Sequence, residues 1–355
     1  MPADIAHLNA VGTAVPPHDV HHAFIAWASD RVDDRARPLF ARMAARAGIA
    51  HRWSVLPGVG GASAVEAGGF YADGMPGTAA RMAIYAEAAP GLALAAIGAL
   101  GEQVGLDGIT HLVVASCTGF VAPGIDQIIA ARLGLSSAVE RLLIGFMGCY
   151  AAIVALRSAR HIVRSDPGAR VLVVTVELSS LHLQQEDAVE PLLAMLQFGD
   201  GAAAALVSAE ASGIALGRPF AANLPDSAAL IRWTITDTGF AMHLDGAVPG
   251  RIGTALTEPG FVATVTGGTP PADLFWAVHA GGRSILDAVQ SALALPVDAL
   301  SASRGVLADN GNMSSATLMF VLARLLADPP AARSGVALAF GPGLAAEGLA
   351  LRFAT

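Results

Sequence analysis

The sequence predicts an α/β fold that is built from two similar halves. Strand-like and helix-like stretches alternate along most of the 355 residues, an order typical of a mostly parallel sheet with helices on both faces. Residues 170–176 form an almost continuous run of Val and Leu, as expected for a strand buried on both faces. From about residue 212 the order of elements starts again. We therefore expect two halves that share one core, 1–212 and 213–355.

The elements of the first half follow from hydrophobic periodicity and from turn residues. Thr78 is a good N-cap for a helix that runs to about residue 87, and Pro90 fits the first turn of a second helix that ends near residue 104. Helices are also expected at 18–32, 38–47, 123–133 and 149–164. Strands are expected at 5–15, 111–116, 141–147, 170–176 and 201–208.

The second half has the same alternation. Residues 232–244 read as one or two strands, and residues 250–265 as a helix with a break at Pro259-Gly260. Further strands are expected at 274–278, 336–340 and 344–353, and further helices at 282–294 and 312–327.

The composition excludes several classes of function. Of the residues 54% are hydrophobic and 14% charged, which indicates a large buried core, and the net charge of −8 argues against a nucleic-acid surface. The chain has no lysine, which excludes lysine Schiff-base chemistry. Two cysteines, no recognisable signal peptide at residues 1–4 and an apolar stretch at 88–100 too short to cross a bilayer favour a cytoplasmic protein.

Cys149 is the first candidate for chemistry. It follows the apolar run 142–147 and Gly148, and a helix-like run with small residues begins directly after it. This pattern predicts a thiol on a tight turn at the N-terminus of a helix, where free N–H groups favour the thiolate. The alternative is a small buried hydrophobic residue.

His279 and Asn312 are the other two candidates. His279 ends the predicted strand 274–278, and Asn312 follows an Asn-Gly pair at the start of a helix. Ligands of doubly wound sheets bind at the carboxyl ends of strands, where Cys149 and His279 are both expected. The alternatives are a well-packed histidine and a helix N-cap.

Several motifs in register resemble those of a type III polyketide synthase, the chalcone-synthase-like branch of the thiolase superfamily. The resemblance covers almost the whole chain, has bacterial features, and implies a thiolase-like αβαβα layered fold. The matching segments are Gly148-Cys149, Phe198-Gly199-Asp200-Gly201-Ala202-Ala203, Phe275-Trp276-Ala277-Val278-His279-Ala280-Gly281-Gly282, Gly311-Asn312-Met313-Ser314-Ser315-Ala316 and Phe340-Gly341-Pro342-Gly343-Leu344.

The resemblance implies a role for each candidate. Cys149 takes an acyl group from coenzyme A, and His279 holds its thiol as thiolate. His279 and Asn312 donate hydrogen bonds to the malonyl thioester oxygen, where decarboxylation places negative charge. Phe198 lies between the CoA tunnel and the cavity and presents an apolar face to the departing carboxylate.

Other positions correspond to binding residues of the family. Arg42 and Arg46 match CoA phosphate contacts, with a solvated helix face as the alternative, and Leu39 stands where a third basic residue is expected. The positions that match the cavity lining are Cys117, Thr118, Ser179, His182, Trp233, Met242 and Ser314. Met242 replaces an aromatic gatekeeper of the plant enzymes, and Cys117 has a packed thiol as its alternative.

The expected protein is a homodimer that condenses an acyl-CoA starter with malonyl-CoA, without a bound cofactor or metal. Its expected products are alkylpyrones or alkylresorcinols. The nearest alternative is a β-ketoacyl carrier-protein synthase of the same superfamily, which uses the same three residue types. A non-catalytic thiolase-fold binding protein is the alternative from another class.

Overall fold

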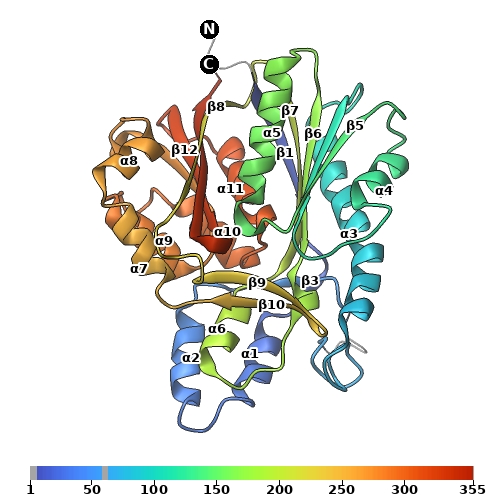
Figure 1. Ribbon diagram of the computed structural model, residues 1–355, viewed down its shortest axis with the longest axis vertical. Helices are drawn as coiled ribbons and strands as arrows, with labels where there is room; N and C mark the ends of the chain where they lie inside the picture. Colours follow the sequence, from blue (N-terminus) through green and yellow to red (C-terminus); the bar gives the residue numbers. More distant parts are fainter. Residues whose placement is uncertain (1–5, 58–62, 355) are drawn as a thin grey trace.

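Nine strands form one sheet that runs through the whole molecule (Figure 1). The computed structural model describes residues 6–57 and 63–354. The strand order is β11-β12-β13-β8-β1-β7-β6-β4-β5. The first half contributes β1 (His7–Ala14), β4 (His111–Ser116), β5 (Glu140–Gly145), β6 (Val171–Leu178) and β7 (Asp200–Ser208). The second contributes β8 (Ile214–Asn223), β11 (Phe275–Val278), β12 (Ser334–Gly341) and β13 (Ala345–Phe353).

Three hydrophobic clusters give the molecule its layers. The central cluster packs α5 (Ala151–Ser165) and α11 (Ser315–Ala327) between the strands of the two halves (Figure 1). A second packs α3 (Thr78–Gly101) and α4 (Ile125–Arg132) on the outer face of the first half. The third packs α7 (Val248–Ala255), α8 (Pro259–Thr266), α9 (Arg283–Ala292) and α10 (Ser301–Asn310) on the second half. This is the expected αβαβα arrangement.

The expectation of a mostly parallel sheet is wrong, because the sheet is mixed. Only β4 with β5, β4 with β6 and β11 with β12 pair in parallel among the described strands. The other pairs are antiparallel. Between β12 and β13 the chain has only Pro342–Leu344, which is too short for the crossover that parallel strands require.

The predicted helix break at Pro90 is also wrong. α3 runs unbroken over 24 residues with Pro90 inside it. Proline costs about 3 kcal/mol within a helix, and packing against the sheet outweighs this cost. A Cβ on Gly12 of β1 would lie 2.2 Å from the main-chain nitrogen of Leu100, so helix and strand are in direct contact. α3 has the length and composition of a membrane span, but Ala89, Ala93 and Leu100 are buried in the protein core.

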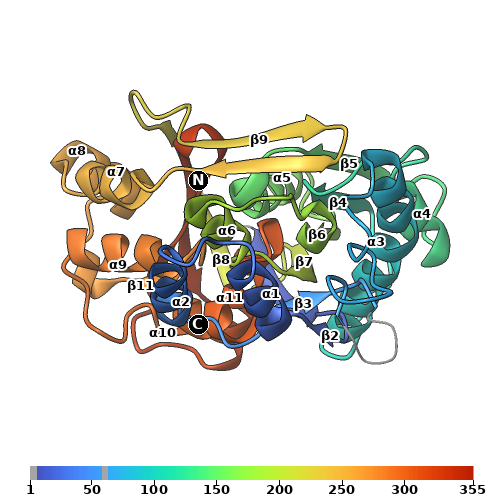
Figure 2. The same cartoon turned by 90° about the horizontal axis from the view of Figure 1, so that it is seen from below.

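The remaining helices and strands build the lower part of the molecule. The predicted helices near 18–32 and 38–47 are α1 (His21–Ser29) and α2 (Arg37–Arg46). β9 (Ile231–Thr236) and β10 (Gly239–Leu244) form a separate ribbon, and α6 (Val189–Met195) lies beside α1 and α2 (Figures 1 and 2). α6, α10 and β8 were not predicted. Residues 1–4, on which the absence of a signal peptide was judged, lie outside the described residues.

Candidate active site

The three predicted candidates line one cavity. Cys149 comes from the turn after β5, His279 from the end of β11, and Asn312 from the connection between α10 and α11. All three side chains are buried. The cavity also contains Phe198 and the predicted lining residues Cys117, Thr118, Ser179, Trp233, Met242 and Ser314. Residues that lie 163 positions apart in the sequence, 149 and 312, therefore share one chamber.

The turn that carries Cys149 depends on glycine at 148. Gly148 has a φ of +75°, and a Cβ there would lie 2.4 Å from Cδ of Pro342. A Cβ on Gly341 would lie 2.7 Å from the Tyr150 ring and 3.3 Å from the main-chain nitrogen of Cys149. Only residues without a side chain allow these two segments to approach so closely. The Gly-Pro-Gly motif after β12 therefore supports the nucleophile turn.

Both the oxygen and the nitrogen of the Asn312 carboxamide are hydrogen-bonded. Its Oδ1 accepts a hydrogen bond from the Ser314 N–H at 2.8 Å, and its Nδ2 donates to the Gly281 carbonyl at 3.2 Å. Ser314 has a φ of +47°, an unusual conformation for a residue with a side chain. The polar side chains of Ser314 and Asn312 also lie near the Cys149 sulfur and lower the pKa of its thiol. Asn312 is thus both a local cap and a neighbour of the thiol.

Burial keeps the thiol and the imidazole neutral when each is considered alone. It raises the pKa of the Cys149 thiol to about 11, against the hydrogen bonds from Ser314 and Asn312 that favour the thiolate. It lowers the pKa of His279 to about 3. Neither ring nitrogen of His279 has a hydrogen-bond partner among the described residues. One ring nitrogen can therefore accept a proton, and the other can donate its N–H to a substrate oxygen.

Glu177 lies behind the nucleophile and was missed by sequence reasoning. The carboxylate of this fully buried residue accepts hydrogen bonds from the Cys117 N–H and the Thr118 hydroxyl, both at 2.9 Å, and from the Ser315 hydroxyl. Burial raises the pKa of Glu177 to about 7, and its charge raises the pKa of Cys149. A single glutamate within the apolar strand β6 was the signal that could have identified it.

The pKa of Glu177 gives a test of this arrangement. In the folded protein Glu177 stays protonated up to about pH 7, whereas the unfolded chain releases the proton near 4.5. The wild type should therefore lose stability as the pH rises from about 4.5 to about 7, by on the order of 3 kcal/mol. Glu177→Gln lacks this loss, so its melting temperature relative to the wild type should be higher at pH 8 than at pH 5. A difference that does not change with pH contradicts the assignment.

Cys117 is a packed thiol at the edge of the cavity. Its sulfur accepts a hydrogen bond from the Gly148 N–H at 2.9 Å. Burial and the neighbouring Glu177 raise its pKa well above the ordinary value for a cysteine. Cys117 therefore supports the turn before Cys149 and has none of the features of a second nucleophile.

Trp233 and Met242 face each other across the β9–β10 ribbon, where they are directly paired. Both line the catalytic cavity and a second cavity of about 110 Å³ next to it, as do Ser179 and Phe198. The catalytic cavity itself is narrow, about 40 Å³. Phe340 and Pro342 of the matching segment 340–344 also line it, and the lining residues that the sequence analysis did not name are Phe146, Ile231, Leu244 and Ile285.

His182 lines the second cavity and not the catalytic one. Its ring stacks on Phe240 with 4.2 Å between centroids, and its Nδ1 accepts the Phe240 N–H at 3.0 Å. Nε2 is therefore the protonated nitrogen, and it donates to the Thr118 carbonyl at 2.7 Å. Burial lowers the pKa of His182 to about 4. This neutral, fixed imidazole belongs to the wall of the second cavity.

Arg42 and Arg46 lie on the exposed side of α2 and line neither cavity. The Arg46 carbonyl accepts a hydrogen bond from Arg283 Nη1 at 3.2 Å, which joins α2 to the start of α9. Ile285, on the first turn of the same helix α9, lines the catalytic cavity.

The fold and the cavity together define a class, an α/β enzyme of the thiolase type with a buried cysteine at a strand-to-helix turn. Comparisons with known proteins narrow the class. Models of the chalcone and stilbene synthase family match the chain over residues 2–211, as the N-terminal domain, and 219–355, as the C-terminal domain.

Individual relatives agree with the family match. A bisdemethoxycurcumin synthase from Oryza sativa subsp. japonica is 38% identical over 78% of this chain and 74% of its own length. The alpha-pyrone synthesis polyketide synthase-like Pks18 from Mycobacterium tuberculosis is 33% identical over 72% of this chain and 67% of its own length. The structure of PKS-I from the brown alga Ectocarpus siliculosus covers 99% of both chains, with 28% identity and a TM-score of 0.88.

The chain belongs to the chalcone and stilbene synthase family. It is a type III polyketide synthase, an enzyme that catalyses decarboxylating condensation, and the family uses acyl-CoA substrates. The predicted family, fold and class of enzyme are thereby confirmed.

Proposed function

We propose that Cys149 accepts the starter acyl group from an acyl-CoA and that malonyl-CoA then extends it by two carbons per round. The observation that carries this proposal is the placement of Cys149, His279 and Asn312 on one cavity. Thioester exchange at Cys149 forms the sulfur–acyl bond and releases the CoA thiol, which takes up the proton that His279 received from Cys149.

Asn312 and His279 serve the decarboxylation. The bond between the malonyl carboxylate and its methylene carbon breaks, carbon dioxide leaves, and the electron pair becomes the enolate of acetyl-CoA. Hydrogen bonds from Asn312 Nδ2 and the His279 ring stabilise the enolate oxygen. Phe198, on the same cavity, keeps the departing carboxylate in an apolar surrounding. The enolate carbon then attacks the acyl carbonyl on Cys149, and the thiolate leaves.

The expected products are alkylpyrones or alkylresorcinols made from fatty acyl starters, and the name of the relative Pks18 refers to alpha-pyrone synthesis. A panel of acyl-CoAs of increasing length, each incubated with malonyl-CoA and analysed by mass spectrometry, tests this proposal. Malonyl units on a carrier protein form a parallel arm. Activity with the carrier-protein arm alone would favour the β-ketoacyl synthase alternative, and absence of acylation and CO₂ release in both arms would favour a binding protein.

His279 is proposed as the proton acceptor of Cys149. A lone charge is unfavourable in the buried cavity, but a thiolate and an imidazolium that form together stabilise each other, and the pair titrates as a unit. His279→Ala removes the acceptor, so the midpoint of Cys149 alkylation by iodoacetamide should move upward, towards about 11. An unchanged pH profile in this variant would show that His279 does not take the proton.

A homodimer is proposed across the edge of the sheet at β5. β5 is the last strand in the sheet order, and Leu142 and Leu143 on it are 42% and 43% exposed, with Phe120 at 47%. A bare edge with apolar side chains is a surface that another chain covers. Leu142→Glu should convert the dimer to a monomer in analytical ultracentrifugation. Val297→Glu is the matched control at a remote position that is 86% exposed, and a dimer in both variants would contradict the proposal.

The roles of the two halves, the lack of a cofactor, the location of the enzyme and the CoA-binding residues are also proposals. The halves 1–212 and 213–355 act as the nucleophile-bearing half and the half that supplies His279 and Asn312. The reaction needs no bound cofactor or metal, with CoA thioesters as the substrates. The enzyme works in the cytoplasm, in agreement with its two unpaired cysteines. Arg42 and Arg46 on α2 are proposed to bind the CoA phosphates, and salt-dependent KM values for malonyl-CoA test this.

A further inference from the structure

A buried arginine connects two of the segments that form the catalytic cavity. Arg52 lies just before β3 (Trp53–Ser54), and its side chain is 3% exposed. Its Nη1 donates hydrogen bonds to the carbonyl of Phe198 at 2.8 Å and to that of Met195 at 3.3 Å. The guanidinium thus holds the main chain on either side of the turn that leads from α6 to Phe198.

The aliphatic part of Arg52 fills space beside two glycines. A Cβ on Gly311, which has a φ of +67°, would lie 2.8 Å from Cγ of Arg52. A Cβ on Gly199 would lie 3.5 Å from Cβ of Arg52. These glycines are the direct neighbours of Asn312 and Phe198, so one side chain contacts both segments.

The two segments are also bonded to each other. The Asn312 N–H donates to the Gln197 carbonyl at 2.7 Å, and the Gly199 N–H donates to the Asn312 carbonyl at 3.0 Å. This isolated parallel bridge fixes Phe198 relative to Asn312. Arg52, the Phe198 segment and the Asn312 segment therefore form one hydrogen-bonded unit.

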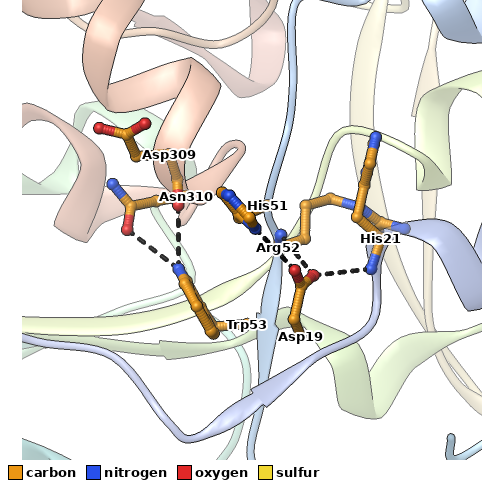
Figure 3. Close-up of polar contacts among 7 residues, drawn as sticks. All are labelled: Asp19, His21, His51, Arg52, Trp53, Asp309 and Asn310. Atoms are coloured by element: carbon orange, nitrogen blue, oxygen red, sulfur yellow. Dashed lines mark hydrogen bonds and ion pairs between the residues drawn. The ribbon is translucent and has the colours of Figure 1, made fainter.

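The segment around Arg52 is itself anchored at both ends (Figure 3). Asp19 accepts hydrogen bonds from the Arg52 N–H at 3.3 Å and from the His21 N–H at 3.0 Å, and pairs with His51 Nδ1 at 2.7 Å. On the other side, Trp53 Nε1 donates to the Asp309 carbonyl at 3.0 Å and to Asn310 Oδ1 at 3.2 Å. Trp53 thereby reaches the end of α10, two residues before Asn312.

Arg52 stays positively charged although it is buried. Burial lowers the pKa of Arg52 to about 10, so the guanidinium stays protonated at neutral pH. Burial and the neighbouring Arg52 lower the pKa of His21 to about 4, which leaves Nδ1 of His21 free to accept the Arg52 Nε–H at 3.1 Å. A buried cation is costly unless it is hydrogen-bonded. Nε and Nη1 of Arg52 donate to His21, Met195 and Phe198, whereas Nη2 is buried without a partner among the described residues.

We propose that Arg52 is a positioning residue for decarboxylation, because it fixes Phe198 and Asn312 at the distance that the malonyl thioester requires. Arg52 does not touch the reacting atoms and acts through these two residues. The inference rests on the roles proposed above for Asn312 and Phe198. Starter loading on Cys149 uses the thiol and His279, which Arg52 does not contact, so the two half-reactions should respond differently.

Two half-reactions of the full-length enzyme provide the test. Arg52→Met keeps the volume and removes the donors, and Arg52→Lys keeps the charge and one donor group. In Arg52→Met the kcat for CO₂ release from malonyl-CoA should fall about tenfold or more, since a small misplacement of catalytic groups has large effects. Acylation of Cys149 by a starter acyl-CoA, followed by intact mass, should stay within about twofold of the wild type. The decarboxylation rate of Arg52→Lys should lie between those of the wild type and Arg52→Met.

Arg160→Met is the matched control, because Arg160 is a buried arginine that donates to the Leu216 carbonyl at 2.9 Å, outside both cavities. In Arg160→Met the ratio of the decarboxylation rate to the acylation rate should equal that of the wild type. Equal losses of decarboxylation and acylation in Arg52→Met, or no loss of either, would overturn the inference. If Arg52→Met does not fold, the ratio of the decarboxylation rate to the acylation rate in Arg52→Lys decides instead. Asn312→Ala tests the catalytic role of Asn312 separately from the positioning role of Arg52. If Asn312→Ala decarboxylates malonyl-CoA at the wild-type rate, the role proposed for Asn312 is wrong, whatever the result for Arg52.

Discussion

Cys149→Ala should abolish polyketide formation, with a loss of about 1,000-fold or more, as expected when a covalent nucleophile is removed. The acyl group then has no attachment point in the cavity, and the enolate has no electrophile to attack. Decarboxylation of malonyl-CoA should persist, because Asn312, His279 and Phe198 remain on the cavity wall. The measurements are product formation by mass spectrometry, acyl label on the protein and CO₂ release.

Cys117→Ser is the control for the loss of a buried sulfur. The serine hydroxyl can still accept the Gly148 N–H that Cys117 accepts at 2.9 Å, so the nucleophile turn should be preserved. Condensation should remain largely intact in this variant. If Cys117→Ser abolished acylation while Cys149→Ala kept it, the assignment of the two thiols would be reversed.

Asn312→Ala should lower decarboxylation and condensation together by about 100- to 1,000-fold, the usual effect of removing one oxyanion donor. The lost group is the carboxamide that bonds both the Gly281 carbonyl and the Ser314 N–H, and it also reaches the Cys149 sulfur. Loss of this polar neighbour of the sulfur should reduce starter loading to a smaller extent. Rates of CO₂ release and of acylation, measured separately, distinguish the two effects.

Asn310→Ala is a matched control for Asn312→Ala. Asn310 ends α10, and its amide bonds the Trp53 indole and the Val306 carbonyl, with no contact to the catalytic cavity. Its bond to Trp53 helps to anchor the Arg52 segment, so Asn310→Ala should lower stability and should lower decarboxylation by about tenfold at most, far less than Asn312→Ala does. A decarboxylation rate in Asn312→Ala close to that of Asn310→Ala would contradict an oxyanion role for Asn312.

Local patterns in the sequence predicted the parts of the site that depend on local structure. The strand, glycine and helix around Cys149 are consecutive in the chain, so periodicity and turn chemistry identify them. His279 at a strand end was placed by the same reasoning. The direction of the strands was not predictable in this way, because it depends on which strands become neighbours, as with β12 and β13.

The features that the sequence did not reveal depend on tertiary contacts. Pro90 stays within α3 because the sheet holds the helix, and the pairing of Trp233 with Met242 depends on the register of a ribbon. Glu177 and Arg52 are single charged residues whose hydrogen-bond partners lie at least 59 and 31 positions away in the sequence. No local pattern encodes such partners, and only the folded chain brings them together.

The proposed mechanism requires one substrate oxygen to meet both the imidazole of His279 and the carboxamide of Asn312 beside the sulfur of Cys149. A crystal structure of Cys149→Ala with malonyl-CoA tests it most directly. The malonyl thioester oxygen is expected at about 3 Å from a His279 ring nitrogen and from Asn312 Nδ2, with the carboxylate towards Phe198. A thioester oxygen that points away from both groups, or malonyl-CoA bound outside this cavity, would contradict it.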